Sequence, residues 1–130
     1  SGSVFSNVVH PLFFETFVNP NINKIPTDKA KVSHVLTNAM PEMFGYLESQ
    51  LGEQVFLVGS APTVPDWHLA SALTTMQYLG FALDDQRFAR LASLYRRTVR
   101  TSAMRQALRD EQPAVQGMGL KSDFLDDVLA

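Results

Sequence analysis

Between Trp67 and Leu83 the sequence contains no Lys, Arg, Asp or Glu. A helix over this stretch has no face suited to water, so other elements of the fold must cover it on all sides. The stretch is shorter than the roughly 20 apolar residues that cross a bilayer, and it contains His, Ser, Thr and Gln, so we do not interpret it as a membrane span. The chain must therefore supply further helices that pack around a buried central one.

Four residues, Thr63-Val64-Pro65-Asp66, mark the start of this central helix. Their spacing is that of a capping box, in which the Thr63 hydroxyl accepts a hydrogen bond from the Asp66 amide and the Asp66 carboxylate accepts one from the Thr63 amide. Pro65 falls in the first turn, where a missing amide hydrogen is tolerated, and the Asp66 charge suits the positive end of the helix dipole. Gly80 either ends the helix or permits a close backbone contact, and the helix end is the favoured interpretation.

The first helix is predicted over residues 4–18, where apolar residues recur at three- and four-residue spacing. Phe14, Phe17 and Val18 then fill its other side. A helix that is apolar all round needs cover on two faces, either from its own domain alone or from its own domain and a further partner. Pro11 is expected to bend this helix unless the helix begins close to Pro11 itself.

A second helix follows the turn residues Asn19-Pro20-Asn21 and Ile25-Pro26. Thr27 or Asp28 can cap it, and its apolar stripe extends from Val32 to Leu51 before Gly52 ends it. Pro41 lies inside this segment and is expected to kink it, because it removes the hydrogen bond to the Thr37 carbonyl.

Two more helices are predicted after the central one. Asp84-Asp85 begins the first, whose apolar stripe is formed by residues between Phe88 and Val99. Thr101 or Ser102 caps the second, which is short, and Pro113, Gly117 and Gly119 end the regular structure. The expected fold is therefore all-α, an orthogonal/up-down helical bundle of about five helices.

The chain has 130 residues, of which 45% are hydrophobic, so it has the size and composition of one globular domain. Residues 1–3, Ser-Gly-Ser, are interpreted as a cloning remnant, residues 4–113 as the helical domain, and residues 114–130 as a C-terminal tail for which the sequence also allows one short helix. No cysteine is present, so a disulfide, a thiolate metal site and a cysteine nucleophile are all excluded.

The remaining residues indicate no self-contained active site. His10, His34 and His68 are too scattered for a metal motif, so no metal is expected. No phosphate-binding loop, nucleophile elbow or Ser/His/Asp arrangement is present. The net charge of -2 gives no general attraction to nucleic acid or to an anionic membrane, and neither partner is expected. Seven arginines between Arg87 and Arg109 are interpreted as a solvated face, with phosphate binding as the alternative.

The order of these signals resembles the C-terminal helical domain of cytosolic glutathione transferases over nearly the whole chain. The resemblance rests on Leu47-Glu48-x-x-Leu51, Phe56-Leu57-Val58-Gly59 and Thr63-x-x-Asp66, followed by a helix over residues 88–99 and another over residues 102–111. Its most specific part is the Phe-Leu-x-Gly run with the capping box, which in the family is a folding determinant. Pro65, Trp67 and Pro41 depart from the family's usual residues.

The resemblance implies that this chain is one part of a parent protein. In the family a preceding thioredoxin-like domain binds glutathione, which is then a co-substrate of the parent, and the helical domain binds no cofactor alone. The helical domain supplies the wall of the hydrophobic electrophile site and part of a dimer or interdomain surface. By the same resemblance the parent is expected to be a cytoplasmic homodimer active in detoxification, and this chain alone is expected to be inactive.

The resemblance also selects candidate site residues on the first helix, which lines the family's electrophile site. These candidate substrate-binding residues are Ser6, Asn7, His10, Phe14 and Phe17. Bacterial beta-type members carry a His-Lys pair shortly before Pro-Leu-Phe, and here Ser6 and Asn7 stand at those places, which argues against a beta-type mechanism. No catalytic residue is assigned. The alternative function is a non-catalytic docking module, because some proteins use this helical domain only to bind other proteins.

Overall fold

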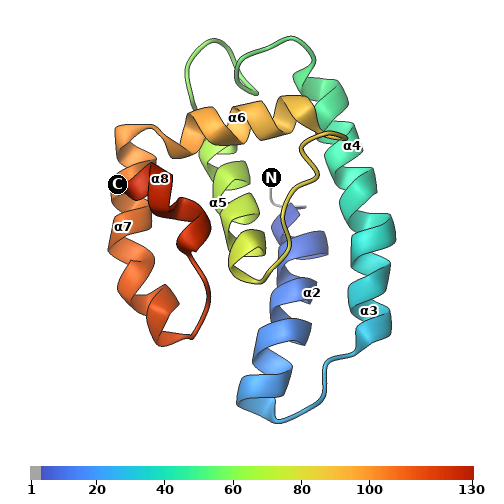
Figure 1. The fold of residues 1–130 in the computed structure, drawn as a ribbon. Helices are drawn as coiled ribbons and strands as arrows, with labels where there is room; N and C mark the ends of the chain where they lie inside the picture. The colour runs from blue at the N-terminus through green and yellow to red at the C-terminus, as the bar shows by residue number, and fades with distance from the viewer. Residues whose placement is uncertain (1–3) are drawn as a thin grey trace.

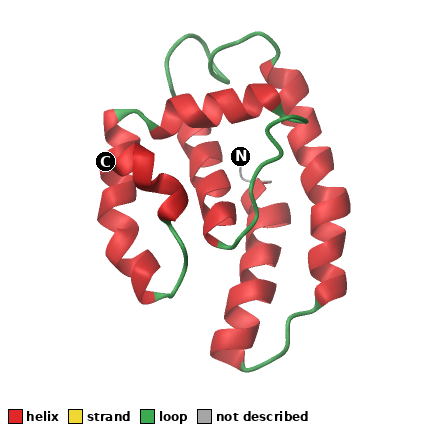
Figure 2. Ribbon diagram, viewed as in Figure 1, coloured by secondary structure: helices red, strands yellow, loops and turns green. Residues whose placement is uncertain are grey.

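The computed structural model of the chain describes residues 4–130, which consist of helices and connecting loops and contain no strand. Figure 2 shows this all-helical organisation, and the expected all-α bundle is confirmed. The expected cloning remnant at residues 1–3 lies outside the described residues.

Two long arms form one side of the molecule. The first arm (residues 5–23) consists of the wide π-helical segment Phe5–Val9, α2 (His10–Phe13) and a second wide segment, Phe14–Asn23. The second arm (residues 29–51) consists of α3 (Lys29–His34), the wide segment Val35–Ala39 and α4 (Met40–Leu51). The arms lie side by side and antiparallel, joined at one end by a short loop (Figure 1).

The first arm is longer than the sequence predicts, so the expected turn at Asn19-Pro20-Asn21 was wrong. The helix continues through Pro20 to Asn23 and ends at Lys24, which takes the left-handed conformation with φ of 57°. Pro20 has no amide hydrogen to donate to the turn below it. The Glu15 carbonyl, five residues before Pro20, accepts a 2.8 Å hydrogen bond from the Thr27 hydroxyl instead. A contact with the following loop thus compensates for the proline.

Pro11 and Pro41 are accommodated in a similar way in the two arms. Each lies in the first turn of an α-helical segment, α2 or α4, that directly follows a wide segment. Because Val9 and Ala39, which precede these segments, are themselves helical, each proline leaves one carbonyl of the preceding wide segment without its intrahelical donor. The positions at which the sequence predicted a bend therefore coincide with changes of helical pitch.

The central helix is α5 (Val64–Tyr78), and the structure confirms that it is buried. Leu69, Ala72, Leu73 and Met76 are at most 3% exposed. Gly80, with φ of 97°, ends the helix as predicted. The Gly80 amide donates to the Gln77 carbonyl at 3.0 Å and the Phe81 amide to the Met76 carbonyl at 2.8 Å, which is the Schellman pattern of helix termination.

The last two long helices differ from the prediction at one end each. The first is α6 (Ala89–Val99), which crosses the top of the bundle in Figure 1 and begins five residues after Asp84. The Asp84 carboxylate accepts from the amides of Gln86 and Arg87 in a separate turn, so placing the start of the helix at Asp84-Asp85 was wrong.

The second is α7 (Ser102–Gly117), which is longer than predicted because it continues through Pro113. Pro113 and Arg109 are both exposed, so water can solvate the carbonyl that the proline leaves without a partner. Gly119, with φ of 75°, follows the end of the helix. The tail then forms a short 3₁₀ turn, Asp123–Leu125, and α8 (Asp126–Leu129), and α8 lies beside α7 (Figure 1).

Two hydrophobic clusters hold these helices together. The first joins the two arms to α5 and α6 and includes Leu12, Phe44 and Leu91. The second joins α5 to α7 and the tail and includes Tyr78, Leu108 and Leu125. Residues of α5 belong to both clusters, which is the arrangement that its uncharged sequence predicts.

Candidate functional site

A groove runs between the two arms. Its volume is about 730 Å³, and its first-arm wall is formed by Ser6, Asn7 and Pro11. The second arm contributes apolar and polar groups together, namely His34, Val35, Ala39, Glu42, Met43 and Tyr46. The volume lies within the range of small-molecule sites, and the mixed lining is typical of them. This groove is therefore the candidate site of the arms.

The five candidate substrate-binding residues fall into two groups. Ser6 and Asn7 line the groove, whereas His10, Phe14 and Phe17 lie outside its lining. None of the five is buried. Phe14 is 49% exposed, and Phe17 stacks on Phe13 with 5.4 Å between ring centroids. The buried side of the first arm is formed by other residues, so the phenylalanine that the prediction depends on most, Phe14, is not part of the core.

Two polar residues of the first arm are buried, and the sequence reasoning did not select them. Glu15 and Asn19 are 6% and 7% exposed, and the Asn19 amide donates to Glu15 Oε1 at 3.2 Å. The same oxygen accepts from the Asp28 amide at 3.0 Å, while Asp28 caps α3 through the amides of Ala30 and Lys31. Glu15 therefore fixes the loop that joins the arms. Its spacing could have predicted this burial, because Glu15 follows Val8 and Leu12 at four- and three-residue intervals and so lies on the same, buried side of the helix.

The predicted capping box is present at the start of α5. Asp66 is fully buried, and its Oδ2 accepts from the Thr63 amide at 2.8 Å and from the Thr63 hydroxyl at 3.2 Å. The structure shows one further hydrogen bond that the sequence did not predict. The Asp66 Oδ1 atom accepts from the Leu57 amide at 2.9 Å. Asp66 thus also holds the Phe-Leu-x-Gly run against the start of α5.

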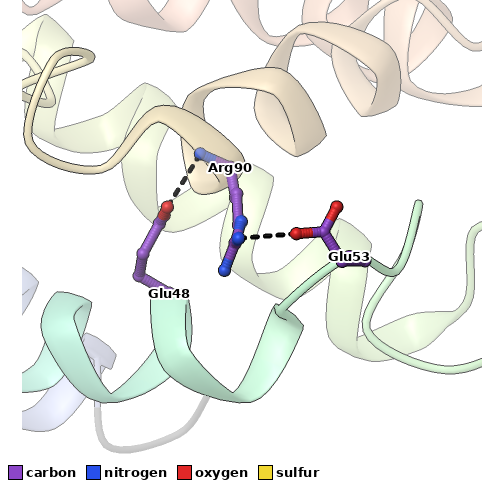
Figure 3. Close-up of polar contacts among 3 residues, drawn as sticks. All are labelled: Glu48, Glu53 and Arg90. Atoms are coloured by element: carbon purple, nitrogen blue, oxygen red, sulfur yellow. Dashed lines mark hydrogen bonds and ion pairs between the residues drawn. The ribbon is translucent and has the colours of Figure 1, made fainter.

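The start of α6 is capped by a residue distant in sequence. Both carboxylate oxygens of Glu48, on α4, accept from backbone amides, those of Arg90 and Leu91, at 2.9 Å each. Figure 3 shows the Glu48 contact to Arg90 beside the ion pair between the Arg90 guanidinium and Glu53, which are 2.7 Å apart. The ion pair is exposed and therefore weak, but the hydrogen bonds that Glu48 accepts from the two backbone amides fix the angle between α4 and α6.

Two tyrosines connect α5 to neighbouring helices. The Tyr78 hydroxyl donates to Glu111 Oε1 at 2.7 Å, and the Tyr95 hydroxyl lies 2.9 Å from the Thr74 hydroxyl. Burial raises the pKa of Tyr78, and the hydrogen bond to the Glu111 carboxylate raises it further. Burial also raises the pKa of Tyr95. Both hydroxyls are therefore structural contacts that stay protonated at neutral pH.

Within residues 4–130, no three His, Asp or Glu side chains come close enough to hold a metal ion. In the same range no helix is long and apolar enough to cross a membrane. The described residues thus form a helical domain with a groove between its two arms.

The comparison with protein families identifies the class of this domain. A family model described as the glutathione S-transferase C-terminal domain matches residues 13–106, which is most of the chain. The chain therefore belongs to this family, and the resemblance inferred from the sequence is confirmed. Comparisons with curated proteins and with solved structures gave no further match.

Proposed function

We propose that this chain is the electrophile-binding domain of a glutathione transferase. In this proposal a thioredoxin-like domain of the parent binds glutathione, and the first arm forms the apolar wall beside which the electrophile is held. The exposed side of the arm, with Ser6, Asn7, His10, Phe14 and Phe17, faces the electrophile and the thioredoxin-like domain. The domain itself orients the electrophile and excludes water, and it activates no thiol.

The observation that carries the proposal is the exposure of Phe14. A large apolar side chain that is 49% exposed, on an arm whose opposite side is fully packed, has surface left for a ligand or another domain. The groove between the arms supports the same interpretation, because Ser6 and Asn7, which line it, add polar groups beside the apolar surface of Phe14. An electrophile with an apolar body and one polar group fits such a surface.

The test is glutathione conjugation by the full-length gene product with a panel of electrophiles of different shape. Phe14→Ala is expected to change the relative kcat/KM values among the electrophiles while the melting temperature stays within a few degrees of that of the unchanged protein. The control is Val58→Ala, because Val58 is 59% exposed but lies in the loop between α4 and α5. If Phe14→Ala unfolds the protein, Phe14 is core; if both variants leave the electrophile preference unchanged, the first arm is not the site.

The second candidate is a docking module, and the exposed apolar side chains favour it as well. Ile22 and Ile25, at the end of the first arm and in the loop after it, are 63% and 52% exposed. A docking module would form a complex of fixed stoichiometry through this end of the arm and would show no conjugation activity in the full-length protein. Size-exclusion chromatography with light scattering, combined with the conjugation assay, distinguishes the two functions. The same measurement tests the homodimer expected for the parent.

A further inference from the structure

A second cavity lies on a different side of the molecule, where α5, α6 and the C-terminal tail meet. Its volume is about 220 Å³, and its apolar lining includes Leu73 of α5, Val99 of α6, and Phe124 and Val128 of the tail. It shares no lining residue with the groove between the arms. The volume is smaller than that of pockets for drug-sized ligands, so the cavity suits a small molecule.

Two arginines of α6, Arg96 and Arg100, also line this cavity. They are four residues apart, so they are neighbours on one side of the helix, where like charges destabilise it. Within the described residues neither guanidinium forms an ion pair. Arg96 donates to the Ser93 hydroxyl at 3.3 Å and Arg100 to the Arg96 carbonyl at 3.2 Å, so each retains several N–H groups without a partner.

The neighbouring arginines have structural contacts that Arg96 and Arg100 lack. Arg90 pairs with Glu53, Arg97 donates to the Val55 carbonyl and lies over the Phe56 ring, and Arg87 lies over the Phe88 ring. These contacts explain three arginines of the cluster that the sequence singled out. Of the remaining four, Arg105 and Arg109 lie on α7 outside the cavity, whereas Arg96 and Arg100 line it and have N–H groups free to contact a ligand.

The other polar groups of the cavity define the charge of that ligand. Asp85 and Gln77 line it together with Tyr95, whose hydroxyl is already bonded to Thr74. Asp85 offsets one of the two guanidinium charges, which leaves one positive charge beside the apolar side chains of Leu73 and Val99. A small anion of single charge with an apolar body is complementary to this arrangement, because it pairs with the arginines and fills the space beside Leu73 and Val99.

We infer that this cavity is a binding site for a small monocarboxylate with an aliphatic or aromatic body. The carboxylate lies between Arg96 and Arg100, and the apolar body extends toward the tail. Because Phe124 and Val128 form part of the wall, the occupied site holds the tail against α5 and α6. This site is independent of the proposed electrophile site, since the two cavities share no residue.

The test measures binding of octanoate to this chain by calorimetry, with 1-octanol as the uncharged probe of equal chain length. Octanoate is expected to bind more tightly than 1-octanol and to lose affinity as the salt concentration rises. Arg96→Gln and Arg100→Gln are each expected to weaken octanoate binding by roughly tenfold and to leave 1-octanol binding unchanged. Arg109→Gln is the matched control, because Arg109 is an exposed arginine of α7 outside the cavity.

Hydrogen exchange gives a second readout that does not depend on the variants. Octanoate is expected to slow amide exchange in Asp126–Leu129, and inorganic phosphate is not. Equal affinity for octanoate and 1-octanol would overturn the role of the arginines. Displacement of octanoate by phosphate at equal concentration would reduce the site to a general anion patch, and absence of octanoate binding would overturn the site itself.

Discussion

Replacement of Asp66 by alanine tests whether the start of α5 depends on a buried clamp or on an ordinary helix cap. The Asp66 carboxylate accepts from the amides of Leu57 and Thr63 and is fully buried. Loss of an exposed N-cap costs about 1 kcal/mol. In Asp66→Ala the N-cap residue Thr63 remains, and the loss comes from two partly buried amides left without an acceptor; at roughly 1 kcal/mol each, the free energy of unfolding should fall by about 2 kcal/mol.

The assay is urea unfolding followed by far-ultraviolet circular dichroism. Asp28→Ala is the control, because the Asp28 carboxylate also accepts from two amides, those of Ala30 and Lys31 in the first turn of α3, but Asp28 is exposed. We expect a loss of about 1 kcal/mol for Asp28→Ala, and for Asp66→Asn a loss between those of the two alanine variants. If Asp66→Ala cost no more than Asp28→Ala, the contact between Asp66 and the Leu57 amide would contribute nothing and the clamp would be refuted.

Three further outcomes follow from contacts between elements. Glu48→Ala should cost about 1 to 2 kcal/mol and speed hydrogen exchange at the amides of Arg90 and Leu91, whereas Glu53→Ala, which removes only an exposed ion pair, should leave that exchange unchanged. Glu15→Ala should lower the free energy of unfolding by about 2 kcal/mol, because it leaves the Asp28 amide and the buried Asn19 side-chain amide without an acceptor, and urea unfolding measures this loss. A loss within experimental error would show that Glu15 does not fix the loop between the arms. The pKa of Tyr78 and that of Tyr95 are both raised by burial, so the folded state holds these protons more tightly than the unfolded state does. The stability that they contribute is complete below the ordinary tyrosine value of 10.0 and is lost as the pH rises above it. Unfolding measured across alkaline pH should show this loss, and Tyr78→Phe should reduce its slope.

The sequence predicted the elements whose cause is local. The absence of charge between Trp67 and Leu83 predicted the buried helix, and the spacing of Thr63 and Asp66 predicted its start. Gly80 predicted its end, because the backbone there has a positive φ that other residues rarely adopt. The start and end signals each depend on residues within about one turn, and the absence of charge is a property of one continuous segment, so none of these predictions needs a contact with a distant part of the chain.

The boundaries that the sequence missed are set by residues far along the chain. The start of α6 depends on Glu48, more than forty positions earlier, so the nearby Asp84-Asp85 was a misleading signal. The first arm continues past Pro20 because the Thr27 hydroxyl takes the carbonyl that the proline leaves free. Proline and acidic residues indicate helix ends only where neither a distant group nor water satisfies the backbone.

The candidate site was predicted only in part for the same reason. The family resemblance selected residues of the first arm, but neither it nor the helical periodicity carries information on which residues of the second arm lie opposite. The groove residues His34, Glu42 and Tyr46 therefore had no signal, although Ser6 and Asn7 did. Phe14 and Phe17 could not be separated from core phenylalanines by pattern, because exposure is a property of the whole packing.

The position of α5 in both hydrophobic clusters has a consequence for how the chain unfolds. Neither cluster is complete without α5, so melting of the arms removes one wall of the α7 cluster, and melting of α7 and the tail uncovers an uncharged helix to water. A partly folded state with only one of the two clusters formed is therefore high in free energy, whichever cluster it retains. The chain should lose its structure in a single cooperative transition, although its long arms and its tail lie at opposite sides of the molecule.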